Sequence, residues 1–209
     1  MNISNKMPWI FACAIGLLLG GCASPDIVLH PTFPPPAIQE TAATQGTIQL
    51  TVDYTGNSPQ LSQYEKMGGE TQIGSSESMG VHLSTFWIKE APSKLIERML
   101  QNNLNAWGYQ VTSQPQAIQL LGHIKKFALN SKAINAFEFQ ADGVVDLSLD
   151  VTKNGRSSYK GDYVETCTFK TATQIPNQDN MDKLFSDCLT KLQTQLDNDN
   201  RLRAALSPY

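Results

Sequence analysis

The chain has few of the residues that usually carry chemistry. Its 209 residues include three histidines and four cysteines. His30, His82 and His123 lie far apart, and neither a Cys-x₂-Cys nor a His-x₃-His spacing occurs, so the usual zinc signatures are missing. The sequence therefore predicts no metal site and no cofactor.

Catalytic motifs are equally scarce. Ser75 to Ser78 lacks the flanking glycines of a nucleophile elbow, and Gly68-Gly69 lacks the Lys-Ser/Thr of a phosphate loop. Asp142, Asp146 and Asp150 are carboxylates at even spacing, but they fall on the solvent face of a predicted strand, where solvation explains them. We therefore expect a protein that is not an enzyme, with an enzyme as the weaker alternative.

The sequence has no excess of positive charge and no run long enough to cross a bilayer. Formal net charge is −3, and removal of residues 1–21, whose single charge is Lys6, would leave −4. This mild acidity gives no electrostatic footprint for nucleic acid. The apolar run from Trp9 to Leu19 is about half of the ~20 residues that a membrane-spanning helix needs.

The N-terminal residues have the pattern of a lipoprotein signal. Lys6, the apolar run and Leu19-Gly20-Gly21-Cys22 follow the order of a charged start, an apolar core and a small-residue cleavage site. This order predicts a lipobox with acylation of Cys22, and several acyl chains on one cysteine give firm anchoring. An ordinary secretory signal with a chance cysteine is the alternative. Because Ala23 is not the aspartate that retains lipoproteins at the inner membrane, we expect the outer membrane, with the domain facing the periplasm.

Three parts of the chain are predicted: a signal peptide over 1–21, a lipidated tether over 22–45, and one domain over 46–209. The tether is expected to be extended, because Pro31 and Pro34-Pro35-Pro36 fix φ and oppose a helix. It would hold the domain off the membrane, although a proline-recognition ligand is a second interpretation. The remaining length supports one core.

Alternating apolar residues predict several strands. They occupy Thr47 to Tyr54, a stretch from Val81, Ile118 to Leu129 with a bulge at Lys125-Lys126, and Phe137 to Val151, whose odd positions are apolar. A strand returning from an Asn154-Gly155 hairpin turn follows. The polar stretch Gly56 to Ser78 has no useful period and is predicted to be a loop, either functional or disordered.

Two stretches have helical periodicity. One begins at Pro92 and ends at Gly108, and the second covers Asn177 to Asp197, followed by a short amphipathic tail, Arg201 to Leu206. The predicted fold class is α+β: a largely antiparallel twisted sheet with two amphipathic helices packed on one face.

The order of these elements resembles the YajG-like family of outer-membrane lipoproteins. It is a lipobox, a proline-bearing tether, a strand, a helix ending in Gly108-Tyr109-Gln110-Val111, long strands joined through Asn154-Gly155, and a leucine-rich last helix. The layout is also similar to auxiliary lipoproteins of ABC-type intermembrane lipid transport systems. The resemblance implies a structural or interaction module in the periplasm with a protein partner in the envelope. A lipid-transport accessory is the alternative, and neither family implies catalytic residues or an oligomeric state.

A disulfide between Cys167 and Cys188 is predicted. Cys13 would leave with the signal peptide and Cys22 would be acylated, which leaves two thiols in an oxidising compartment. Cys167 shares the apolar face of the last strand, and Cys188 lies on the apolar stripe of the helix expected to cover that strand. Two buried free thiols are the alternative.

Overall fold

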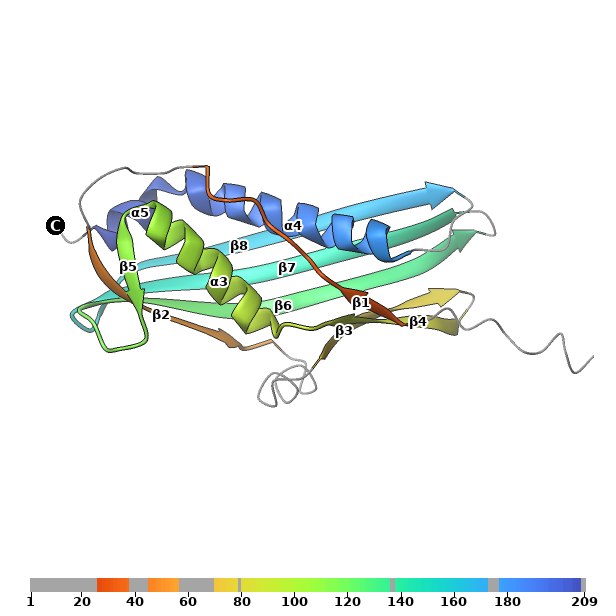
Figure 1. The fold of residues 1–209 in the computed structure, drawn as a ribbon, viewed down its shortest axis with the longest axis horizontal. Coiled ribbons are helices and arrows are strands. Elements are labelled where there is room, and N and C mark those ends of the chain that lie inside the picture. Colours follow the sequence, from red (N-terminus) through yellow and green to blue (C-terminus); the bar gives the residue numbers. More distant parts are fainter. Residues whose placement is uncertain are drawn as a thin grey trace, which may run out of the picture.

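In the computed structural model, three long strands run the length of the molecule and form its central sheet. They are β6 (Ile118–Asn135), β7 (Glu138–Lys153) and β8 (Arg156–Ala172), each antiparallel to the next (Figure 1). The structure describes residues 26–37, 45–56, 70–78, 80–135, 138–172 and 177–207. Residues 1–25, with the predicted lipobox, lie outside the described part.

The two faces of β7 differ in burial as the sequence predicts. Val145, Leu147, Leu149 and Val151 are 0% exposed, whereas the even-numbered neighbours are half-buried. Successive side chains of a strand point to opposite faces, so one apolar face and one polar face result. Phe137, the first residue of the predicted strand, lies outside the described residues.

Local backbone signals in the ladder are also confirmed. Asn154 and Gly155 have φ values of 51° and 76°, which is the left-handed pair that a type I′ hairpin turn requires. The β6–β7 register shifts between Ile124 and Lys126, at the predicted bulge.

The sheet is mixed, so the prediction of a largely antiparallel sheet is wrong in this respect. The described residues form an eight-stranded sheet. Parallel pairs join β2 (Gly46–Tyr54) to β5 (Tyr109–Thr112) and to β6, and also join β3 to β6. A strand's alternation reports which face is buried and contains no information on the direction of its neighbour, so the long connection between β2 and β6 decided the parallel pairing.

The polar stretch predicted to be a loop contains a strand. Residues Thr71–Ser78 form β3, antiparallel to β4 (Val81–Ile88), while residues 57–69 lie outside the described part. A Cβ on Gly74 would lie 1.5 Å from the carbonyl oxygen of Leu129, so the missing side chain allows β3 to approach β6 closely. The neighbouring strands, not an apolar period, make this segment extended.

Three helices are present among the described residues, one more than predicted: α3 (Pro92–Ala106), α4 (Gln178–Asn198) and α5 (Asn200–Leu206). Gly108, with φ 85°, follows α3 in the left-handed conformation expected there. Both long helices pack on the face that carries the odd-numbered residues of β7. Phe185 of α4 lies against Gly143, and Leu100 of α3 lies against Gly122, which is paired with Leu149 on that face. None of the described helices is long and apolar enough to cross a membrane.

Adjacent valines of β7 give a matched test of this register. Val145→Asp places a charge in a fully buried position, which costs more than about 4 kcal/mol and should unfold the domain. Val144→Asp, on the other face, should cost about 1 kcal/mol or less. Urea unfolding of the protein lacking residues 1–22 measures both. Greater sensitivity at Val144 would contradict the register.

Candidate functional site

Residues 26–37, called the strap here, cross over the domain and connect it to the predicted anchor. Within the strap, β1 (Ile27–Leu29) pairs in parallel with β4. Ile27 and Leu29 are 7% and 1% exposed, so both belong to the core. This part of the predicted tether is therefore packed on the domain and extends it toward the N-terminus beyond residue 46.

A carboxylate fixes the start of the strap. Asp26 accepts hydrogen bonds from the backbone N–H of Thr85 (3.0 Å) and from the indole N–H of Trp87 (3.3 Å). The bond from Thr85, with a smaller contribution from Trp87, lowers the pKa of Asp26 below its usual value. Asp26 therefore stays ionised, and its two hydrogen bonds hold the start of the strap against β4.

Helix α4 holds the middle of the strap. Asp182 accepts from the backbone N–H of His30 (2.6 Å), and Ser186 Oγ accepts from that of Thr32 (2.9 Å). Gln178 donates to the carbonyl oxygen of Val28 (2.7 Å). Positions 178, 182 and 186 recur every four residues, so they form one polar stripe along the helix, beside its apolar stripe. The backbone N–H of Ala37 donates to the Asp197 carboxylate (3.2 Å) near the other end of the helix.

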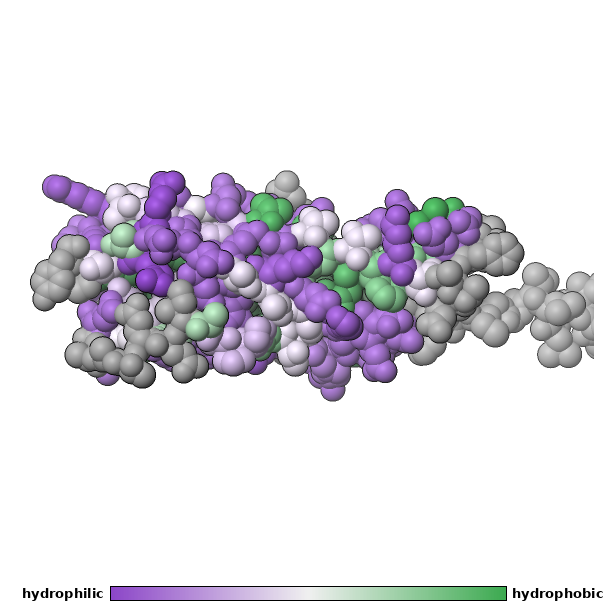
Figure 2. Space-filling model, turned by 90° about the horizontal axis from the view of Figure 1, so that it is seen from above, coloured by the Kyte–Doolittle hydropathy of each residue, from purple (hydrophilic) through white to green (hydrophobic). Residues whose placement is uncertain are grey.

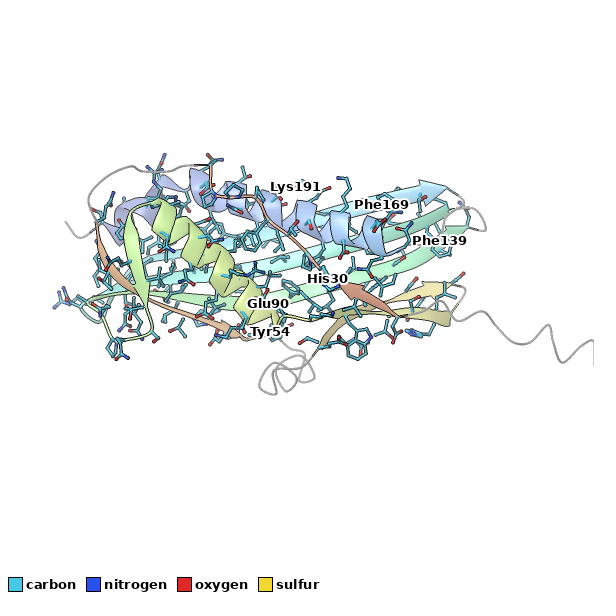
Figure 3. The ribbon with its side chains drawn as sticks, viewed as in Figure 1. His30, Tyr54, Glu90, Phe139, Phe169 and Lys191 are labelled. Atoms are coloured by element: carbon cyan, nitrogen blue, oxygen red, sulfur yellow. A yellow bond between two sulfur atoms is a disulfide. The ribbon has the colours of Figure 1, made fainter. Side chains whose placement is uncertain are left out.

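A hollow lies under the strap where it passes the start of α3. It has a volume of about 270 Å³ and combines apolar residues from β1, β4 and α3 with charged residues at its rim. Figure 3 shows His30 on the strap and Glu90 just before α3 on the same side of the molecule. Arg98 pairs with Glu90 (2.6 Å) and lies over the ring of Phe33, 5.1 Å from its centroid. The lining residues are Leu29, His30, Pro31, Thr32, Ile88, Lys89, Glu90, Leu95 and Arg98.

The predicted disulfide is present and connects α4 to the sheet. The Cα atoms of Cys167 on β8 and Cys188 on α4 are 5.6 Å apart, within the range that a disulfide requires. Both residues are buried, at 4% and 0% exposure. The same helix therefore has a covalent bond to the sheet and hydrogen bonds to the strap.

One carboxylate joins α5 to β8. Asp199 Oδ1 accepts from the backbone N–H groups of Arg201 and Leu202, both at 2.9 Å, and so caps α5. Its Oδ2 accepts from the hydroxyls of Tyr159 (2.5 Å) and Tyr163 (2.8 Å). Burial raises the pKa of Asp199, but these hydrogen bonds outweigh it, so the net pKa is lowered. Burial, followed by its hydrogen bonds to Tyr159 and Asp199, raises the pKa of Tyr163, so its hydroxyl stays protonated and donates to Asp199.

The histidines lie apart and contact different partners. His82 Nε2 is 3.2 Å from the hydroxyl of Thr85, and His123 Nδ1 is 2.7 Å from Asp53 Oδ1. In the described ranges, no three histidine, cysteine or carboxylate side chains come together as metal ligands.

The remaining candidates from the sequence are spread over the outer face and β3. Asp142 accepts from Thr168 (2.8 Å), and Asp150 pairs with Lys160 (2.9 Å). Ser75 to Ser78 are part of β3, and Gly68-Gly69 lie outside the described residues. None of these groups is arranged with another as an acid–base pair within the described part.

Polar residues dominate the surface seen from above, and apolar residues are visible mainly in a narrow hollow and as isolated side chains (Figure 2). Two large apolar side chains are exposed among the described residues, Ile134 at 45% and Val164 at 53%. Ile134 is near the end of β6, and Val164 is in the middle of β8.

A family model described as an uncharacterized lipoprotein matches residues 31–207. The chain belongs to this lipoprotein family. The match agrees with the predicted resemblance to YajG-like lipoproteins and does not extend to the auxiliary lipoproteins of lipid transport. No curated protein matches the chain.

Three solved structures are similar to this chain over three quarters of its length or more. A protein from Xanthomonas campestris is 10% identical with a TM-score of 0.46, over 87% of this chain and 94% of its own. A minor lipoprotein from Acinetobacter baumannii is 11% identical with a TM-score of 0.39, over 76% and 94%. The rare lipoprotein B from Shewanella oneidensis is 8% identical with a TM-score of 0.33, over 75% and 92%.

The disulfide can be predicted from the sequence, whereas the contacts of the strap cannot. Cys167 and Cys188 could be paired because each lies on an apolar stripe whose packing partner was predicted. Asp182 and Ser186 are on the polar side of α4, where solvation is the ordinary expectation. The apolar triplet Ile27-Val28-Leu29 was the available signal, since three such residues beside prolines are consistent with a short buried strand.

Removing the disulfide should destabilise the domain by about 3 kcal/mol, because it closes a loop with a sequence separation of 21 residues. The Cys167→Ala/Cys188→Ala variant and the reduced protein should unfold at similarly lower urea concentrations. The variant itself should be insensitive to reductant. Two alkylatable thiols in the unreduced, unfolded protein would contradict the bridge.

Asp199→Asn should lower stability at pH 7 by about 1–2 kcal/mol, because one amide oxygen cannot replace a carboxylate that accepts four hydrogen bonds. The folded pKa of Asp199 is below the unfolded value, so its stabilisation is present above about pH 4 and is lost as pH falls further. The variant should therefore lose less stability on acidification than the wild type. Asp187→Asn, on the exposed side of α4, is the control, and urea unfolding at several pH values measures the difference.

Proposed function

We propose that the chain acts as a non-enzymatic, lipid-anchored lipoprotein of the outer membrane, whose periplasmic domain is a structural or interaction module. Acylated Cys22 would provide the anchor. The observation that carries the proposal is the docked strap: Asp26, four residues after Cys22, is bonded to β4, and α4 bonds the residues that follow. Anchor and domain are then connected by a very short segment instead of a long tether.

A structural role is favoured by what the polar side chains do. Asp26, Asp182, Ser186 and Asp199 each accept hydrogen bonds that connect two segments of the fold. We therefore assign these residues to holding the domain in one shape near the membrane.

A lipid-transport accessory is the second candidate, and the hollow under the strap is the observation that favours it. Leu29, Pro31, Ile88 and Leu95 give the hollow an apolar wall between strand and helix, as contact with an acyl chain requires. Affinity capture of the anchored protein from crosslinked envelopes separates the two functions. Recovery of a transport permease or its tunnel protein supports transport, and recovery of cell-wall or scaffold proteins supports the structural module.

Lipidation of Cys22 is tested by metabolic labelling with a fatty-acid analogue. The wild type should be labelled and Cys22→Ser should not, because the thiol is the acylated group. Cys13→Ser, in the predicted signal peptide, is the matched control and should be labelled like the wild type. Equal labelling of the Cys22→Ser protein would contradict lipidation at Cys22.

Sorting to the outer membrane is tested separately. Ala23→Asp should move the protein from the outer- to the inner-membrane fraction, because aspartate after the acylated cysteine retains lipoproteins at the inner membrane.

A further inference from the structure

The length of chain between the predicted lipid and the folded domain limits where the membrane can be. Each residue of an extended chain covers at most ~3.3–3.6 Å, so the four residues from Cys22 to Asp26 span no more than about 14 Å. Asp26 is fixed by its bonds to Thr85 and Trp87. If Cys22 is acylated, as proposed above, the bilayer surface lies within this distance of Asp26.

One end of the sheet lies within about 14 Å of Asp26. Because β1 runs parallel to β4 and Ile27 is level with Phe86, Asp26 lies about four residues, or ~13 Å, from Val81, the first residue of β4. Pairing of Glu77 with Lys132 places the end of β3 beside the last residues of β6. We call the surface where β3 and β6 end and β4 and β7 begin the anchored end (Figure 1).

The anchored end carries exposed apolar surface. Ile134 is one of the two exposed large apolar side chains of the described residues. Phe139, half-buried on β7, is paired with Ala133 and Thr171, and Figure 3 shows it close to this end of the sheet. Away from this end, the outer face of the sheet has charged pairs such as Lys125 with Asp162, and Val164 is its exposed large apolar side chain among the described residues.

Charge at the anchored end is balanced. Glu77, Lys132, Gln140 and Lys170 form a row across β3, β6, β7 and β8, and Glu138 adds a second acidic residue. Two acidic and two basic side chains give no net attraction to anionic headgroups. An apolar contact, insensitive to salt, is therefore the kind of membrane contact that this surface can make.

We propose that the anchored end rests on the bilayer and that Ile134, near the end of β6, enters the headgroup region, with Phe139, near the start of β7, at the same end of the sheet. The strap would then set the orientation of the whole domain, with the long strands directed away from the membrane and the Asn154-Gly155 turn at the far end. The partner is the lipid surface itself.

Fluorescence quenching in vesicles tests the contact. Full-length lipidated protein carrying Ile134→Cys is labelled with a fluorophore, since Cys167 and Cys188 form a disulfide and acylated Cys22 cannot react. Vesicles of phosphatidylethanolamine and phosphatidylglycerol contain lipids with nitroxide-bearing acyl chains. We expect about twofold or greater quenching at position 134, unchanged at 1 M salt. Val164→Cys, the other exposed apolar position, and Arg156→Cys, at the far end, are the controls and should be quenched little.

The outcomes separate this inference from the proposed anchor. If the protein does not float with the vesicles, the proposed lipid anchor is wrong. If the protein floats but shows no excess quenching at position 134, the anchor stands and the proposed orientation on the membrane is wrong. A label at position 134 that is protected in native envelopes but unquenched in vesicles would assign the anchored end to a protein partner and refute the lipid contact. Asp26→Ala should reduce the quenching at position 134 by releasing the start of the strap from β4 and so lengthening the free chain after Cys22, and Asp53→Ala, which removes a partner of His123, should leave it unchanged.

Discussion

The attachment of α4 to the sheet is the constraint on which the other parts of the structure depend. Its apolar stripe packs on the ladder of long strands, where Phe185 fits against Gly143 and contacts the ring of Phe127 with centroids 4.8 Å apart. The bond from Cys188 to Cys167 keeps this packing in register. A helix placed in this way presents its polar side to the chain that crosses it. The position of the strap therefore follows from the position of α4.

The strap changes how the anchor acts on the domain. A flexible proline-bearing tether lets a domain sample many orientations. Here Asp26, four residues after Cys22, is hydrogen-bonded to β4, and Asp182 and Ser186 bind the backbone that follows. Ordering the strap costs conformational entropy, which burial of Ile27 and Leu29 offsets. The gain is a fixed relation between the sheet and the acylated cysteine that we propose.

Several carboxylates of the described residues connect two segments of the fold. Asp199 illustrates the point, because one oxygen caps α5 and the other accepts from two tyrosines on β8. Buried polar groups stabilise a fold only when they are hydrogen-bonded, and such bonds then specify one arrangement of the elements. Asp26 and Asp182 are used in the same way, since each accepts hydrogen bonds that join the strap to β4 or to α4.

The sequence by itself determined the register of β7, the Asn154-Gly155 turn, the bulge near Lys125, and the faces of the two long helices. Each depends on the order of neighbouring residues, which periodicity and φ preferences report directly. It also determined the pair of cysteines, because both lie on predicted apolar faces. Only the tertiary structure decided that β2 and β6 are parallel, that the polar residues Thr71–Ser78 form a strand, and that the strap lies on α4. These features are set by contacts between residues far apart in the chain. Hydrogen bonds between backbones leave no pattern in either partner's sequence, and the backbone N–H groups of the strap leave none that points to Asp182 or Ser186.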